Sequence, residues 1–80
     1  MPRYYFDFLD ERGRVVDDEG RDLQNTQAVQ VEAARSLIDM ARDSLLDVPS
    51  ASIDRLIIEV RDEAGPVMTL RFRFEIEKTN

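Results

Sequence analysis

The sequence predicts a two-layer α+β domain in which one amphipathic helix lies on one face of a four-stranded sheet. Residues 25–46 are the only long segment whose apolar residues recur at helical spacing. The segments before and after the helix alternate apolar and polar residues, as strands do. A hairpin, a helix and a second hairpin in this order form two packed layers. At 80 residues, the chain is expected to be a single domain over residues 1–80.

The first hairpin is predicted from an aromatic strand over residues 3–9 and a short return strand over residues 14–16. Between them, Asp10-Glu11-Arg12-Gly13 offers a glycine where a hairpin loop requires a positive φ. Residues 17–22 are charged and contain glycine, which predicts a loop leading to the helix. The side chains that we place on the core face are Tyr4, Phe6 and Phe8.

The helix has recognisable start and stop signals. Asn25 is a good N-cap because its side-chain oxygen can accept from a free backbone N–H one turn later. Val48-Pro49 ends the helix, since proline disfavours a helical residue before it, and residues 50–52 form a linker. The apolar stripe expected to face the sheet contains Val31, Ala34, Leu37, Ile38, Ala41 and Leu45.

The second hairpin is predicted from strands over residues 53–61 and 67–77, joined by the turn Asp62-Glu63-Ala64-Gly65. The strands over residues 3–9 and 67–77 carry the most large apolar residues, which suits the two central positions of the sheet. The favoured strand order is therefore 2-1-4-3, as in a minimal β-grasp fold, while a ferredoxin-like half and the order 1-2-3-4 stay open. The core positions expected in this hairpin are Leu56, Ile58, Val60, Met68, Leu70, Phe72, Phe74 and Ile76.

The residue inventory argues against catalysis, so we predict that the protein is not an enzyme. There is no histidine and no cysteine, which removes the commonest general base and the strongest nucleophile. Acidic residues are concentrated in the first hairpin and in the loop after it, and we expect them to form a solvated acidic rim. The run Asp17-Asp18-Glu19-Gly20 lacks the spacing of an EF-hand calcium loop. We expect no metal and no cofactor.

The net charge of −6 lowers the expectation of nucleic acid or anionic membrane as a partner. No apolar run approaches the roughly 20 residues that cross a bilayer, so a cytoplasmic location is expected. The alternative to a protein partner is a nucleic-acid-binding accessory protein that uses Arg55, Arg71 and Arg73 on the open sheet face. Cross-strand ion pairs on a wet surface are the competing interpretation of those arginines.

A protein interface is the favoured function. Apolar residues beside the predicted helical stripe and on the outer side of the sheet could form a contact patch with a second copy or another protein. The leading hypothesis is a small, non-catalytic interaction module that self-associates as a homo-oligomer such as a homodimer. The candidate interface residues are Tyr5, Val29, Ala33, Met40 and Ile57.

Several segments together resemble a family of short bacterial proteins. They are the opening Met1-Pro2-Arg3-Tyr4-Tyr5-Phe6, the segment Asp18-Glu19-Gly20 with Leu23 before the helix, and Ile58-Glu59-Val60 with the following Asp62-Glu63-Ala64-Gly65 turn. The family is a domain-of-unknown-function family, common in rhizobia and other alphaproteobacteria, whose members typically open Met-Pro-Arg-Tyr-Phe-Phe. Its usual histidine in the first strand is replaced here by Asp7. The resemblance implies no activity, cofactor or substrate.

Overall fold

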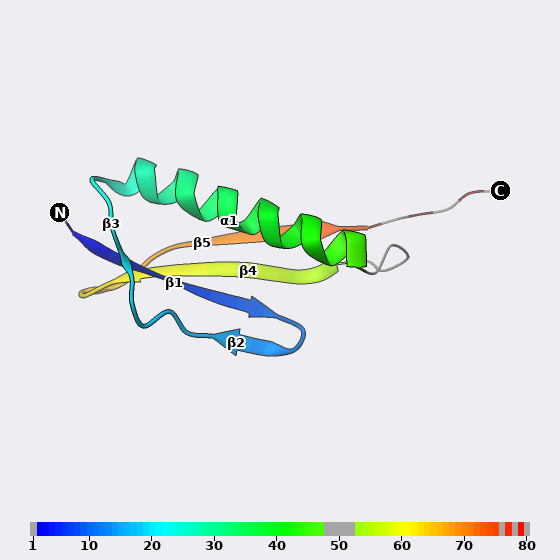
Figure 1. Ribbon diagram of the computed structural model, residues 1–80, viewed down its shortest axis with the longest axis horizontal. Coiled ribbons are helices and arrows are strands. Elements are labelled where there is room, and N and C mark those ends of the chain that lie inside the picture. Colours follow the sequence, from blue (N-terminus) through cyan, green and yellow to red (C-terminus); the bar gives the residue numbers. More distant parts are fainter. Residues whose placement is uncertain (1, 48–52, 76, 78, 80) are drawn as a thin grey trace.

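The computed structural model describes residues 2–47, 53–75, 77 and 79, with the backbone alone for residues 47 and 53–55. The predicted helix stop at Val48-Pro49 and the linker over residues 50–52 lie outside the described residues. Figure 1 shows one helix lying along one face of an antiparallel sheet, which confirms the predicted α+β class. In chain order, the elements are β1 (Arg3–Asp10), β2 (Gly13–Val15), β3 (Arg21–Asp22), α1 (Thr26–Asp47), β4 (Ile53–Asp62) and β5 (Gly65–Phe74).

The strand order differs from the predicted one. The sheet runs β2-β1-β4-β5, and the short β3 also pairs with β1. The first strand of the second hairpin therefore lies beside β1, and the favoured 2-1-4-3 order with its β-grasp comparison is wrong. The physical reason is that β4 is more deeply buried than β5. Leu56, Ile58 and Val60 are buried on the helix side, while Ile57 and Arg61 are half-buried on the other side.

The regular alternation along β5 belongs instead to an edge strand with one wet face. Its outward residues Thr69, Arg71 and Arg73 are all exposed. In an antiparallel sheet with one solvated face, central and edge strands can alternate apolar and polar residues alike, so a regular alternation does not distinguish them. The number of large apolar residues in a strand was therefore a poor guide to its position.

The two acid-glycine turns adopt the same geometry, as their matching sequences predict. Asp10 pairs with Gly13 and Asp62 with Gly65, which leaves two residues at each tip. The glycine φ angles are 136° and 133°, a region that favours glycine. In both turns, the aspartate Oδ1 accepts a hydrogen bond of 2.8 Å from the backbone amide two residues later.

The helix begins as predicted. The Oδ1 of Asn25 accepts a hydrogen bond of 2.9 Å from the amide of Ala28. This satisfies one of the free N–H groups of the first turn.

Replacing Asn25 by alanine is expected to lower the free energy of unfolding by about 1 kcal/mol, because the Ala28 amide loses its acceptor. Urea denaturation followed by circular dichroism measures the change, with Gln24→Ala as the exposed neighbouring control. If Asn25→Ala lowers the free energy of unfolding no more than the control does, the cap does not contribute to stability.

The helix buries a different stripe from the predicted one. Val29 and Ala33 are fully buried and pack with Leu37 and Ala41 against the sheet. By contrast, Val31 is 52% exposed and Ile38 is 59% exposed. The predicted stripe was correct at Leu37, at Ala41 and at the half-buried Leu45, which packs against the core, but it was centred too far toward the face that carries Val31 and Ile38. Among the side chains that the structure describes, the buried apolar core consists of Tyr4, Val29, Ala33, Leu37, Ala41, Leu56, Ile58 and Val60.

Candidate functional site

One carboxylate is buried on the sheet face opposite the helix. Asp7 of β1 is only 5% exposed, so the predicted solvated acidic rim is wrong at this residue. Arg61 of β4 donates to it from Nε at 2.9 Å and from Nη2 at 3.4 Å. The same Nη2 donates to the backbone oxygen of Asp17 at 2.9 Å. The guanidinium of Arg61 also lies 4.6 Å from the centre of the Tyr5 ring.

Asp17 closes a gap in the edge of the sheet. β2 pairs with the far half of β1 and β3 with its beginning, so the middle of this edge has no strand beside it. There, the Oδ2 of Asp17 accepts from the Phe6 amide at 3.0 Å, and its own amide donates to the Oδ1 of Asp7 at 3.0 Å. Its Oδ1 accepts from the amides of Glu19 and Gly20, both at 3.1 Å. One side chain thus replaces a missing piece of β-ladder.

Gly20 is required for this loop to lie close to the sheet. Its φ is 74°, and a Cβ at this position would approach side-chain carbons of Arg3 and Tyr5 to 2.9 Å. Any other residue here would have a strained backbone conformation, and its Cβ would clash with the side chains of Arg3 and Tyr5. The segment over residues 17–22, predicted as a loop throughout, is therefore an irregular edge that ends in the two-residue strand β3.

The pKa values of the buried Asp7 carboxyl and of the half-buried Asp17 carboxyl lie below their ordinary range. For Asp7, burial raises the pKa, but the hydrogen bonds from Arg61 and from the Asp17 amide, with the charges of Arg61 and Arg14, outweigh it. For Asp17, burial again raises the pKa, and the hydrogen bonds from the Phe6, Gly20 and Glu19 amides lower it further than burial raises it. Both groups are therefore held ionised, which suits a structural role better than that of a general acid.

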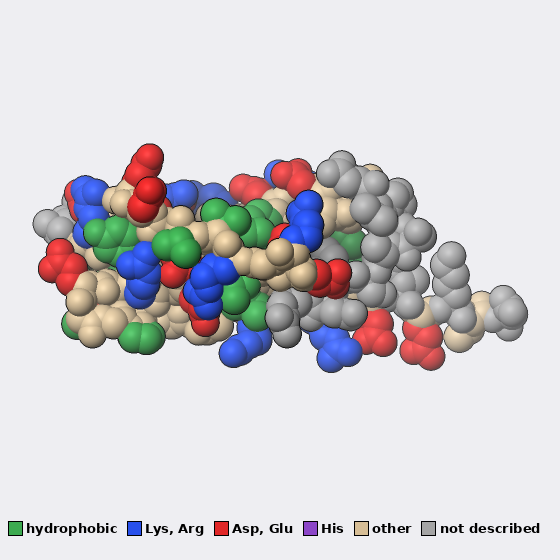
Figure 2. All heavy atoms as spheres, turned by 90° about the horizontal axis from the view of Figure 1, so that it is seen from below, with side chains coloured by type: hydrophobic (Ala, Val, Ile, Leu, Met, Phe, Trp, Pro, Cys, Tyr) green, Lys and Arg blue, Asp and Glu red, His purple; other side chains and the backbone are tan. Residues whose placement is uncertain are grey.

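The charged groups around this cluster are largely paired. Arg14 lies 2.7 Å from a carboxylate oxygen of Glu59 and 3.8 Å from one of Asp7. Arg3 pairs with Asp22 at 3.1 Å. Within the described residues, no group of three or more acidic side chains is placed to hold a metal ion. Figure 2, seen from the side that carries β2, shows acidic and basic side chains interspersed with apolar ones.

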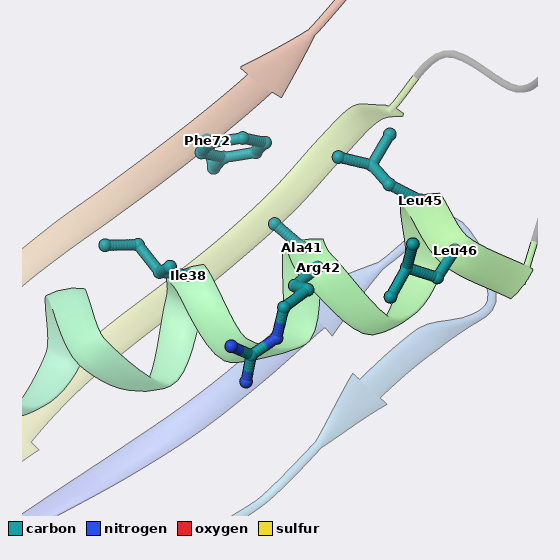
Figure 3. A pocket seen from close by; sticks show the side chains of 6 residues that line it. All are labelled: Ile38, Ala41, Arg42, Leu45, Leu46 and Phe72. Atoms are coloured by element: carbon teal, nitrogen blue, oxygen red, sulfur yellow. The ribbon is translucent and has the colours of Figure 1, made fainter. Parts of the chain in front are cut away.

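A second feature is an apolar groove between α1 and β5, with a volume of about 320 Å³. Figure 3 shows Phe72 of β5 facing Ile38, Ala41 and Leu45 of α1 across this groove. Leu46, which also lines it, is 71% exposed. We call this feature the α1–β5 groove; its lining residues are Ile38, Ala41, Arg42, Leu45, Leu46 and Phe72.

The predicted interface residues do not form one surface. Val29 and Ala33 are core residues with no exposed area, so their placement on an accessible flank of the helix is wrong. Met40 is half-buried and packs against the core. Tyr5 and Ile57 are half-buried on the opposite side of the sheet, as expected for its outer face. The error at Val29 and Ala33 follows from the misplaced helical stripe.

The predicted nucleic-acid contacts are only partly described. The side chain of Arg55 lies outside the described residues. Arg71 and Arg73 are exposed on the outer face of β5, and Arg73 lies 3.6 Å from a carboxylate oxygen of Glu75. The basic surface in the described part of the chain is therefore small and partly neutralised.

The sequence contained signals for the features that were missed. Val31, Ile38 and Leu45 recur at seven-residue intervals, which places them on one face of the helix. Asp7 lies between two phenylalanines of β1, and Arg61 continues the outward row of Ile57 and Glu59 in β4. Opposite charges on the same face of two strands are candidates for an ion pair once those strands are placed side by side.

Comparison with known proteins places the chain in a family. A domain of unknown function, DUF6894, matches residues 3–73. No curated protein and no solved structure matches the chain. Within the described residues, no helix has the length and apolarity needed to cross a membrane. The family match runs from the first residue of β1 to the last but one of β5, and the protein is a member of the DUF6894 family.

Proposed function

We propose that this protein is a non-catalytic interaction module that self-associates through the α1–β5 groove and the adjoining edge of β5. The observation that carries the proposal is the exposure of Ile38 and Leu46 beside Phe72 in a groove whose lining is almost entirely apolar. Large apolar side chains gathered in one place on a small domain mark contact surfaces more often than single exposed ones do.

The edge of β5 supports the same surface. β5 has ten residues and pairs with β4 on one side, and none of the described strands pairs with its other side. A free edge presents backbone donors and acceptors to a further strand. The opposite edge is protected, because β2 and β3 are short and the segment between them, residues 16–20, covers the middle of β1. We call this segment the Asp17 loop. Strand addition is therefore favoured at β5, next to the apolar groove.

The absence of catalysis is part of the proposal. The sequence contains no histidine or cysteine. The carboxylates of the buried Asp7 and the half-buried Asp17 accept hydrogen bonds from Arg61 and from backbone amides. We also propose that the protein is alphaproteobacterial, which its resemblance to the family supports. We propose a cytoplasmic location, which is the expectation for a sequence with no long apolar run.

Size-exclusion chromatography with light scattering tests self-association. The wild type is expected to show a mass that rises toward two chains with concentration. Ile38→Glu is expected to weaken the dimer by roughly thirtyfold, or about 2 kcal/mol, because a charge replaces an apolar contact at the centre of the surface. Val16→Glu, an equally exposed apolar position on the loop after β2, is the matched control. A monomer mass at every concentration would contradict the proposal.

Nucleic-acid binding through Arg55, Arg71 and Arg73 is the alternative. Arg71 and Arg73 lie two residues apart on the exposed outer face of β5, which favours it. The net charge of −6 and the Glu75 carboxylate beside Arg73 weigh against it. A fluorescence titration with single-stranded oligonucleotides at two salt concentrations separates the two functions. Phosphate contacts must weaken as salt rises, and an absence of binding at low salt removes this alternative.

A further inference from the structure

The helix covers only part of the apolar face of the sheet. α1 packs on β4 and β5, and Figure 1 shows β2 and the neighbouring end of β1 lying to one side of it. On this part of the face, Phe6 and Phe8 of β1 are only half-buried. Val15 of β2, which pairs opposite Phe8, is 65% exposed. Apolar side chains of the core face are thus left open beside the helix.

This open part of the face is hollowed. Two hollows of about 360 Å³ each share Phe6, Phe8 and Arg21 in their linings. One extends toward the loop after β2 and the other toward α1, where it reaches Met40. We call the two together the β1 trough. Their individual volumes lie at the lower end of the range for ligand sites. The hollow toward α1 exposes mainly apolar atoms, whereas the hollow toward the loop after β2 exposes polar and apolar atoms in similar amounts.

The charges around the β1 trough leave a negative rim. Arg21 lies over the Phe6 ring, with 5.4 Å from its guanidinium to the ring centre, and it pairs with Glu32. On the helix side, Asp39 pairs with Arg42 at 3.1 Å. Asp18 and Glu19, which line the trough, have no ion-pair partner among the described residues. A group that enters the trough therefore meets two uncompensated carboxylates.

We propose that the β1 trough binds a peptide segment of another protein in which large apolar side chains alternate with lysine or arginine. The apolar side chains occupy the two hollows above Phe6 and Phe8, and the basic groups lie against Asp18 and Glu19. Two adjoining open hollows along one strand suit an extended segment with two apolar anchors. Charge complementarity selects the basic partner, since the domain as a whole carries a charge of −6.

A second copy of this chain fits the trough poorly. A symmetric contact places the same patch of each copy against the other, which brings Asp18 and Glu19 toward their own counterparts. The trough is also separate from the α1–β5 groove, because the two lie on different flanks of α1 and share no lining residue. The peptide proposal therefore stands or fails independently of self-association.

Three labelled octapeptides test the proposal by fluorescence anisotropy on the full chain. They alternate lysine with leucine, lysine with serine, and glutamate with leucine. The lysine–leucine peptide is expected to bind at least about tenfold more tightly than the other two, because only it supplies both charge and apolar side chains. Amide chemical shifts are expected to move at Phe6, Phe8, Val15 and Arg21.

Two pairs of variants locate the site. Asp18→Asn with Glu19→Gln is expected to weaken binding about three- to tenfold, since two exposed charge contacts are lost. Glu11→Gln with Glu63→Gln removes two exposed acids elsewhere and is the control. Val15→Lys is expected to weaken binding at least about tenfold, whereas Val31→Lys, at an exposed valine of the helix, leaves it unchanged.

Each remaining outcome overturns the proposal. No binding of the lysine–leucine peptide at millimolar concentration removes it, as does binding that the Asp18, Glu19 and Val15 variants leave unaffected. Equal affinity for octylamine would assign the trough to a small lipophilic cation. Chemical shifts at Phe8 and Val15 that move on diluting the protein alone would assign it to a second copy.

Discussion

Replacing Asp7 by alanine is expected to lower the free energy of unfolding by about 2–3 kcal/mol. The substitution leaves Arg61 without the carboxylate that receives two of its hydrogen bonds, and it leaves the Asp17 amide without an acceptor. Removing one partner of a buried ion pair typically costs about 3–5 kcal/mol. The lower figure applies here because the Arg61 side chain is 38% exposed and water solvates part of its charge.

Urea denaturation monitored by circular dichroism measures this loss. Asp22→Ala is the matched control, because Asp22 also accepts from an arginine, but both side chains of that pair are nearly half exposed. The control is expected to cost no more than about 1 kcal/mol. If Asp7→Ala costs no more than the control, the buried pair does not hold β1, β4 and the Asp17 loop together.

The same cluster sets the expected response to acid. Folding lowers the pKa of Asp7 and of Asp17, so both favour the folded state when ionised. This stabilisation is complete above the unfolded value of about 3.9 and is lost as the pH falls through the lower folded-state pKa values. The free energy of unfolding is therefore expected to fall steeply below about pH 4. In Asp7→Asn the dependence should be shallower, and an unchanged slope would show that Asp7 contributes nothing to it.

Val29→Asp is expected to leave the domain largely unfolded, whereas Val31→Asp is expected to change the free energy of unfolding by less than about 0.5 kcal/mol. Val29 is fully buried between α1 and the sheet, and Val31 is more than half exposed two residues later. A carboxylate buried without a partner costs several kcal/mol. A domain of 80 residues has only about 4–12 kcal/mol of stability to lose.

Near-ultraviolet circular dichroism and the dispersion of amide signals report whether each variant is folded. The pair is matched because both positions hold valine in the same helix and receive the same charge. If the two variants behave alike, or if Val31→Asp is the more damaging, then the helix packs on the sheet with the face that the sequence pattern alone favoured.

Local features were predictable because their signals lie within a few residues of the chain. The Asn25 cap and the two acid-glycine turns are each determined by residues at most three apart, and all were predicted correctly. The existence of the helix and of both hairpins follows from periodicity alone. Membership of a domain-of-unknown-function family was also predicted, and the family match over residues 3–73 confirms it.

The arrangement of those elements depended on contacts between distant residues. The helix has alanines on two neighbouring faces, so the periodicity did not distinguish the stripe of Val29 and Ala33 from that of Val31 and Ile38. The burial of Asp7 depends on Arg61, 54 residues away, and on a strand order that no local pattern determines. Once β4 lies beside β1, both the order and the buried pair follow.

The Asp17 loop also limits how far association by strand addition can extend. The Asp17 carboxylate accepts the hydrogen bond of the Phe6 amide, and β2 and β3 pair with the rest of β1 on that margin of the sheet. A strand from a neighbouring chain therefore finds few free backbone groups there. Among the described residues, each molecule thus offers one margin to a neighbour, not two. An assembly that grows through a single such margin closes at a pair and does not propagate into a fibre.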